Sequence, residues 1–255
     1  TLAADLSGLD YSVATGQARL STDGLVRFSG AAFGMEFNAL HLTTGLNGLR
    51  TGNGWSLRLP GDGCLDASFI SARLPAMSLG PARTEACAMD GLLFRRGADG
   101  LEGNLALSPL DLTFETDFAE GEFALDEPEV SWQLADAFSL TITGSDFSAP
   151  FELPADGASD PRPAELIADG LSASLNTGGE AVAVIFDLAD GAFDLEDLPV
   201  NLSFDRVSGD GAFTNDGPVI DYTLTDALVE DGLNSSEDSL YQPLLVSGDG
   251  QLTAS

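Results

Sequence analysis

The stretch Leu112-Thr113-Phe114-Glu115-Thr116-Asp117-Phe118 decides the fold, because apolar and polar residues alternate along it. Successive side chains of a β-strand point to opposite faces, so Leu112, Phe114 and Phe118 would share one face. The other face would be polar and acidic. Such one-sided alternation is typical of an antiparallel sheet with one face in water.

The same period of two extends through much of the chain. It recurs at residues 130–134, 138–143, 147–153, 182–188, 200–204 and 220–224. Asp-Gly steps supply the positive φ that tight hairpins need, and we expect turns at these steps. Examples lie at residues 62–63, 90–91, 99–100, 156–157, 169–170, 190–191, 210–211, 216–217 and 249–250. Helical patterns are weak, at residues 81–89, 163–168 and 226–240.

We therefore predict an all-β chain, folded as an elongated, curved, mostly antiparallel meander sheet with an apolar groove. A β-sandwich or a β-helix is the alternative, because an apolar sheet face can also be hidden against a second sheet. Residues 1–255 are expected to form one continuous β-rich segment. Thr1 is not an initiator Met, and no signal sequence opens the chain, so we expect a segment of a longer protein.

The charge of the chain is strongly negative and unevenly distributed. Ten Arg and no Lys face 41 acidic residues, for a net charge of -31. Residues 1–96 are electrically neutral, with eight acids and eight Arg, whereas residues 97–255 hold 33 acids and two Arg. Such a surface repels a phosphate backbone, which excludes nucleic acid as a partner. The acids alternate with Phe, Leu and Val, so we interpret them as the wet face of the sheet.

Aromatic residues are concentrated on the predicted apolar face. They would form either a sealed core or a groove that lipid fills, and the sequence leaves both interpretations open. The candidates for a lipid groove are Phe114, Phe118, Trp132, Phe138, Phe147, Phe151, Phe186 and Phe204.

Cys64 and Cys87 are the only cysteines, and we predict that they form a disulfide. An even number of cysteines in a chain that looks exported favours this pairing, with two buried free thiols as the alternative. The only histidine, His41, lies on the polar side of a predicted strand, where a solvated role is expected.

The sequence contains no strong catalytic or cofactor motif. A calcium solenoid would require tandem nine-residue repeats, and the Asp-Gly steps lack that spacing. Carboxylate pairs such as Glu115 with Asp117, or Glu120 with Glu122, are unavoidable among 41 acids. We therefore predict a non-enzymatic protein with no cofactor and no metal site.

Two passages resemble a known family. The first runs from Gly63 through Cys64 and the Leu-Pro-Ala-Met-Ser-Leu-Gly-Pro stretch at 74–81 to Cys87, and the second covers residues 222–227 and 241–246. Both resemble the middle of YdbH-like proteins of the AsmA-like superfamily. The resemblance implies a curved β-sheet whose apolar groove carries phospholipid between the two membranes of a bacterial envelope. It also implies a periplasmic location and an anchoring N-terminal membrane helix outside these residues.

Two other classes of function compete with this interpretation. One is a β-sandwich or β-helix interaction module on the cell surface, such as part of an adhesin. The other is a polysaccharide-acting enzyme on a β-scaffold, which would need two carboxylates in one cleft.

Overall fold

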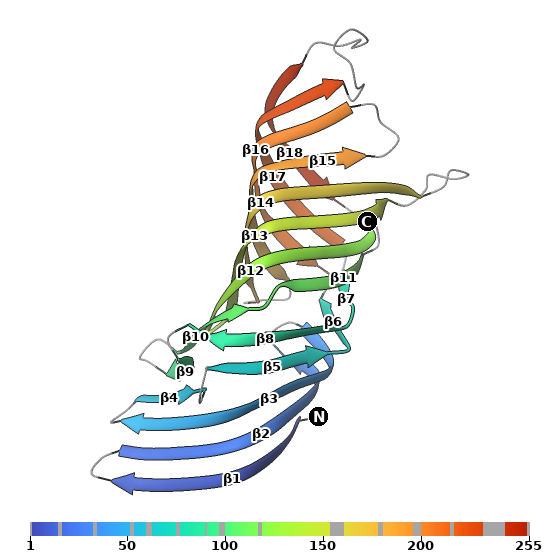
Figure 1. Ribbon diagram of the computed structural model, residues 1–255. Helices are drawn as coiled ribbons and strands as arrows, with labels where there is room; N and C mark the ends of the chain where they lie inside the picture. The colour runs from blue at the N-terminus through green and yellow to red at the C-terminus, as the bar shows by residue number, and fades with distance from the viewer. Residues whose placement is uncertain are drawn as a thin grey trace.

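The computed structural model describes residues 2–14, 17–32, 35–51, 54–59, 63–74, 77–89, 91–96, 100–116, 119–153, 161–177, 181–195, 200–214, 217–231 and 243–253. These residues form 18 β-strands and no helix (Figure 1). The prediction of an all-β, antiparallel chain is confirmed. The weak helical patterns at 81–89, 163–168 and 226–240 are wrong, because the described residues of these ranges lie mainly in β8 (Ala82–Ala88), β14 (Arg162–Asn176) and β17 (Gly217–Asp231), where neighbouring strands take up their backbone hydrogen bonds. Residues 232–240 lie outside the described residues.

Seven long strands make up the C-terminal part of the sheet. They are β12 (Glu120–Leu134), β13 (Phe138–Leu153), β14 (Arg162–Asn176), β15 (Val182–Leu195), β16 (Val200–Thr214), β17 (Gly217–Asp231) and β18 (Leu244–Thr253). Each strand pairs antiparallel with the next one along the chain. At the other end of the sheet, β1 (Leu2–Ala14), β2 (Gln17–Ala32) and β3 (Met35–Thr51) are paired in the same way.

Short strands join these two parts. Along β3 lie β4 (Gly54–Arg58), β5 (Cys64–Phe69) and β6 (Ser71–Leu74), each paired with a different portion of it. The next row contains β7 (Met77–Leu79), β8 (Ala82–Ala88) and β9 (Leu92–Arg96), and β10 (Leu101–Leu107) and β11 (Leu110–Thr116) pair with β12. The pairings of eight strands form a closed circuit, which runs through β3, β4, β9, β10, β12, β11, β7 and β6 and returns to β3. Strands β5 and β8 pair with each other inside this circuit.

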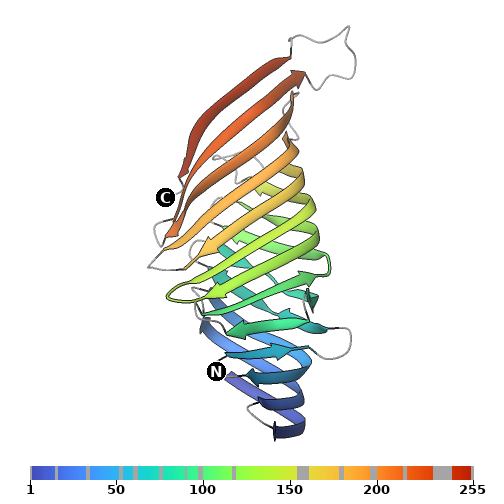
Figure 2. The ribbon, with the colours of Figure 1, turned by 90° about the vertical axis from the view of Figure 1, so that its left-hand side faces the viewer.

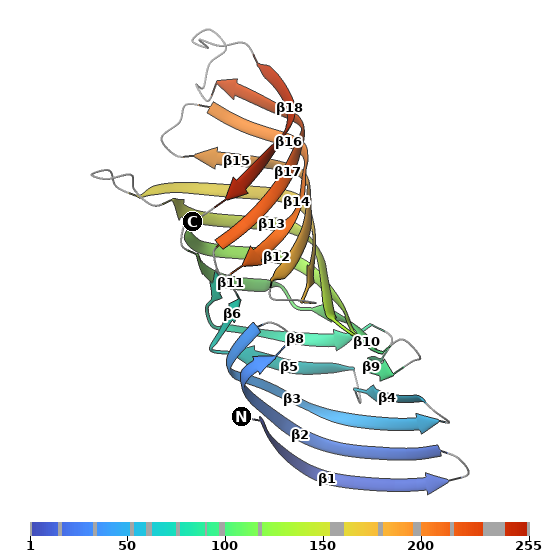
Figure 3. The same ribbon diagram turned by 180° about the vertical axis from the view of Figure 1, so that it is seen from behind.

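The strands follow one another along the long dimension of the molecule. Figures 1 and 3 place β1 at one end and the strands around β17 at the other, and Figure 2 shows the strong twist between them. Long strands of 13–17 residues recur on both sides of the short ones. The short strands therefore fill rows that would otherwise hold one long strand each.

Cross-strand register places most of the apolar residues of these strands on one side, called here the apolar face. In one row, Trp132 of β12 lies opposite Leu140 of β13, which lies opposite Leu175 of β14. The positions between them form the polar face, where the hydroxyls of Thr141 and Ser174 are hydrogen-bonded at 2.9 Å. The alternation in the sequence thus becomes two chemically distinct sides of one sheet.

Each strand from β12 to β17 contains a two-residue step that interrupts this alternation. In β13, both Ser145 and Asp146 lie between the apolar-face residues Gly144 and Phe147. Strict alternation would place only one residue there. Asp146 has a φ of 48°, and Glu127, Asp190 and Asp226 have similar positive values. Ser145 pairs with Gly170 and Phe147 with Ala168, so the steps of adjacent strands are aligned. Register stays constant across the steps from β13 to β17 and shifts only against β12 and β18, and we call this row of steps the bulge line.

The bulge line bends the sheet toward its apolar face. Bulges bend strands and increase their twist, and here the bend is repeated in step from strand to strand. The buried residues Ala168, Leu188, Phe204 and Ala227 form one cluster, although they come from both sides of the line. Apolar-face residues on the two sides therefore pack against each other across the bend.

The bulge line also corrects part of the turn prediction. The Asp-Gly steps at 169–170, 190–191, 210–211 and 249–250 lie inside strands and form no hairpins. Asp190 uses its positive φ for the bulge within β15, while Gly191 continues on the apolar face. Asp23-Gly24 likewise lies inside β2, and the remaining predicted steps fall partly or wholly outside the described residues.

The left-handed backbone at Asp190 makes a specific prediction. Asp190→Gly should keep or raise the free energy of unfolding, because glycine adopts positive φ without strain. Asp190→Val should lower it by about 1–2 kcal/mol, because β-branched residues are strained there. Asp194→Val is the matched control on the same strand, without a positive φ. Urea unfolding would measure all three, and equal effects of the two Val substitutions would contradict the bulge.

Candidate functional site

The apolar face is the candidate site, and it holds every predicted groove residue that the structure describes. The half-buried candidates on this face are Phe114 of β11, Trp132 of β12, Phe138, Phe147 and Phe151 of β13, and Phe186 of β15. Phe204 of β16 is also on this face but is only 5% exposed, within the cluster at the bend. Phe118 lies outside the described residues.

Glycines lie directly opposite several of these rings. Trp132 pairs with Gly103, Phe186 with Gly209, and Phe204 with Gly191. A Cβ on Gly103 would come within 2.7 Å of the Trp132 ring, and one on Gly209 within 2.6 Å of Phe186. The rings therefore lie over the neighbouring strand, in the space that a side chain would occupy, and do not stand upright on the sheet.

Ring-to-ring contacts extend the aromatic surface to the N-terminal strands. Trp55 of β4 packs edge-on against Phe94 of β9 with ring centroids 5.1 Å apart, and Phe94 packs against Trp132 at 6.1 Å. A second row joins Phe37 to Phe28 and Phe69 at 6.3 and 6.4 Å. The sequence alone does not single out these residues, because their strands lack an uninterrupted period of two.

The polar face brings like charges together. Glu120 of β12 lies directly between Glu115 of β11 and Glu152 of β13, so three carboxylates form a row. Glu165 also lies opposite Asp194. Of the carboxylate pairs considered from the sequence, Asp117 lies outside the described residues, and Glu122 faces Thr113. Like charges in direct cross-strand positions destabilise a sheet.

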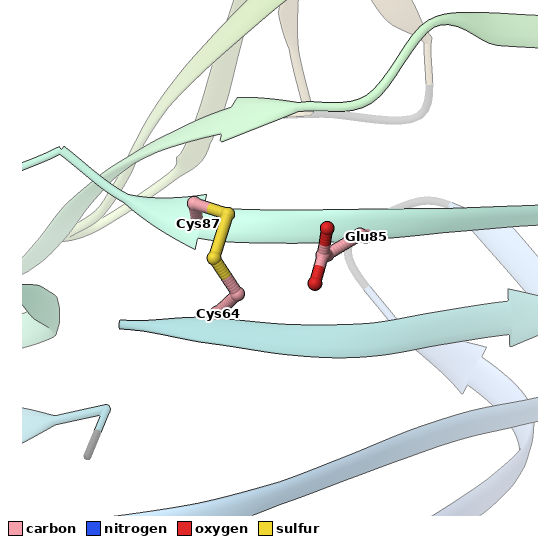
Figure 4. Close-up of side chains that lie close together, drawn as sticks. All are labelled: Cys64, Glu85 and Cys87. Carbon is pink, nitrogen blue, oxygen red and sulfur yellow. A yellow bond between two sulfur atoms is a disulfide. The ribbon is translucent and has the colours of Figure 1, made fainter. Parts of the chain in front are cut away.

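The predicted disulfide is present and ties β5 to β8 (Figure 4). Cys64 and Cys87 are directly paired across these strands, with Cα atoms 3.9 Å apart. Their neighbours Leu65 and Ala86 are buried on the apolar face, so the disulfide belongs to the polar face. Glu85 lies beside it, within 4.8 Å of the sulfurs, but both sulfurs are already engaged in the covalent bond.

Comparisons with known proteins leave the family open. No family model, curated protein or solved structure gives a significant match to this chain. The described residues include no helix of the length and apolarity needed to cross a bilayer.

The disulfide should contribute measurably to stability. Replacing both Cys64 and Cys87 by Ala should lower the free energy of unfolding by about 3 kcal/mol in the chain-entropy model. Adding a thiol reductant should destabilise the native chain by a similar amount and leave the double variant unchanged. Alkylation of the denatured, unreduced chain should label no thiol, and labelling of two would refute the bond.

The acidic row predicts a dependence on salt. The melting temperature should rise between low and moderate NaCl, because salt screens repulsion among exposed carboxylates. Glu120→Gln should raise stability at low salt and reduce this dependence, because Glu120 has a carboxylate on each side. Glu129→Gln is the control, since Glu129 faces Ala106 and Thr143. Equal effects of the two variants would show that the row carries no specific repulsion.

Proposed function

We propose that this chain is a non-enzymatic segment of a bacterial envelope protein that shields phospholipid acyl chains and conducts them between the inner and outer membranes. In this proposal the curved meander sheet forms a groove, and its apolar face is the lining. The observation that carries the proposal is the continuity of that face, which register extends through the consecutive strand pairs from β1 to β18.

The exposed area of the chain supports an open surface. Its accessible surface is 15072 Å², whereas a compact protein of 26.4 kDa is expected to expose about 10,600 Å². The buried residues of the C-terminal cluster are concentrated at the bend, and aromatic rings further from it are half-buried. Acyl chains on such a surface would contribute roughly 0.8 kcal/mol for each buried CH₂ group.

The form of the lining also suits a sliding ligand. The rings of Trp132 and Phe186 lie over glycines of the neighbouring strands, so they would rise less above the sheet than upright rings. No polar group on this surface is needed to move an acyl chain along it.

The location belongs to the same proposal. Disulfides form in oxidising compartments such as the periplasm, and the Cys64–Cys87 bond fits that environment. The resemblance to YdbH-like proteins supports the periplasm and an inner-membrane anchor outside these residues. A surface-exposed interaction module would also carry such a disulfide, and lipid occupancy distinguishes the two.

Tryptophan fluorescence provides the first test. The only two tryptophans, Trp55 and Trp132, both lie on the apolar face. Vesicles of phosphatidylcholine with dibrominated acyl chains should therefore quench the fluorescence of the purified chain, because bromine quenches at short range. Mass spectrometry of the purified chain should also detect bound phospholipid. Absence of both quenching and bound lipid would reject the proposal.

Two adjacent residues of β15 provide the matched variants. Phe186 lies on the apolar face, and Ile185 is 62% exposed on the polar face. Phe186→Glu should remain folded, because an open groove lets the new charge reach water, but bound lipid should fall severalfold. Ile185→Glu should change neither property. Loss of a cooperative melt in Phe186→Glu alone would indicate a sealed core, where a buried unpaired charge costs several kcal/mol.

A further inference from the structure

Two arginines lie on the apolar face, on either side of Trp55. Arg50 of β3 is directly opposite Trp55 of β4, and Trp55 is directly opposite Arg96 of β9. The row continues from Arg96 to Leu101 of β10 and on to Leu134 of β12. Since these residues are at or next to the ends of their strands, the row marks one margin of the apolar face.

The next row inward is aromatic. Phe94 packs against both Trp55 and Trp132, and Gly103 lies between Phe94 and Trp132 in the sheet. A hydrocarbon chain that entered beside Trp55 would therefore meet an apolar path at once. The margin combines cations with an indole, and this combination suits the boundary between lipid headgroup and acyl chain.

The two guanidinium groups are available to a ligand. Both arginines are exposed, and ion pairs among the described residues engage Arg27, Arg83, Arg95 and Arg206. Arg95 illustrates the contrast, because it points to the polar face and pairs with Glu102. Neither Arg50 nor Arg96 has an ion pair within the part of the chain that the structure describes.

The spacing of the two arginines fits one tetrahedral anion. Arg50 and Arg96 are two strands apart, so their backbones are separated by roughly 10 Å. Arginine side chains are long enough to span half of that distance each, and the guanidinium group binds phosphate oxygens through paired N–H donors. The charge of -31 on the whole chain disfavours a free anion that brings no hydrophobic contact.

We propose that Arg50 and Arg96 bind the phosphate of a phospholipid whose acyl chains pass Trp55 and lie against Phe94 and Trp132. This assignment rests on the proposed function, and it adds a headgroup site at a defined margin of the apolar face. It names glycerophospholipid, as opposed to a neutral diglyceride or a fatty acyl chain alone, as the class of ligand.

Two soluble probes test the site. Dihexanoyl-phosphatidylcholine and dihexanoylglycerol carry the same acyl chains, and only the first has a phosphate. Titrations of the full chain in 0.15 M NaCl, followed by tryptophan fluorescence, should show about tenfold tighter binding of the phosphate-bearing lipid. The Arg50→Gln/Arg96→Gln double variant should lose this preference and keep its affinity for dihexanoylglycerol.

A second double variant controls for overall charge. Arg19 of β2 and Arg58 of β4 are not ion-paired among the described residues and belong to the polar face of neighbouring strands. Arg19→Gln/Arg58→Gln removes the same charge and should keep the preference. An equal loss in both double variants, or no preference in the native chain, would overturn the phosphate site.

The remaining outcomes separate the site from the proposed function. Quenching by dibrominated phosphatidylcholine without a phosphate preference would retain the lipid groove and reject the headgroup site. No quenching at all would reject both. Displacement of dihexanoyl-phosphatidylcholine by 10 mM inorganic phosphate would assign the arginines to a free-phosphate site and overturn the lipid assignment.

Discussion

Cross-strand register is the constraint on which the rest of this structure depends. A slip of one residue in any strand would exchange its two faces and bring acids such as Glu165 or Asp187 onto the apolar side. The bulge line makes this constraint stricter, because an additional residue in one strand alone would put half of that strand out of phase with its neighbours. The steps are therefore repeated from β12 to β17, and four of them use a non-glycine residue with positive φ.

The bulge line also explains what the sequence could and could not predict. Alternation at 138–143 and at 147–153 was sufficient to predict strands and to assign their faces. The change of phase at Ser145 and Asp146 resembles a strand boundary, although β13 continues through it. Asp190-Gly191 resembles a hairpin for the same reason, because a single positive φ is compatible with a turn and with a bulge. Composition cannot separate them, since the difference depends on hydrogen bonds to neighbouring strands.

The candidate site, too, could be predicted from the sequence only in part. The face of each aromatic residue follows from local alternation, and the cysteine pairing follows from their number and inferred compartment. The row of Arg50, Trp55 and Arg96 does not follow from the sequence, because register between three strands determines it. The opposition of glycine and aromatic residues is likewise a property of pairs such as Gly209 with Phe186. The alternation of single strands contains no information on how far one strand is shifted against another.

The acidic polar face can be understood as a consequence of the proposed open apolar face. A protein that leaves aromatic rings half-buried risks association through them, and its exposed strand edges add to that risk. Two such sheets that approach each other bring their negative charges together, and the repulsion opposes contact over distances of about 8–10 Å in physiological salt. Most of this charge lies in residues 97–255, which also contain the long strands of the bend. The like-charge rows that destabilise the sheet would therefore provide the solubility that the proposed lipid-binding surface requires.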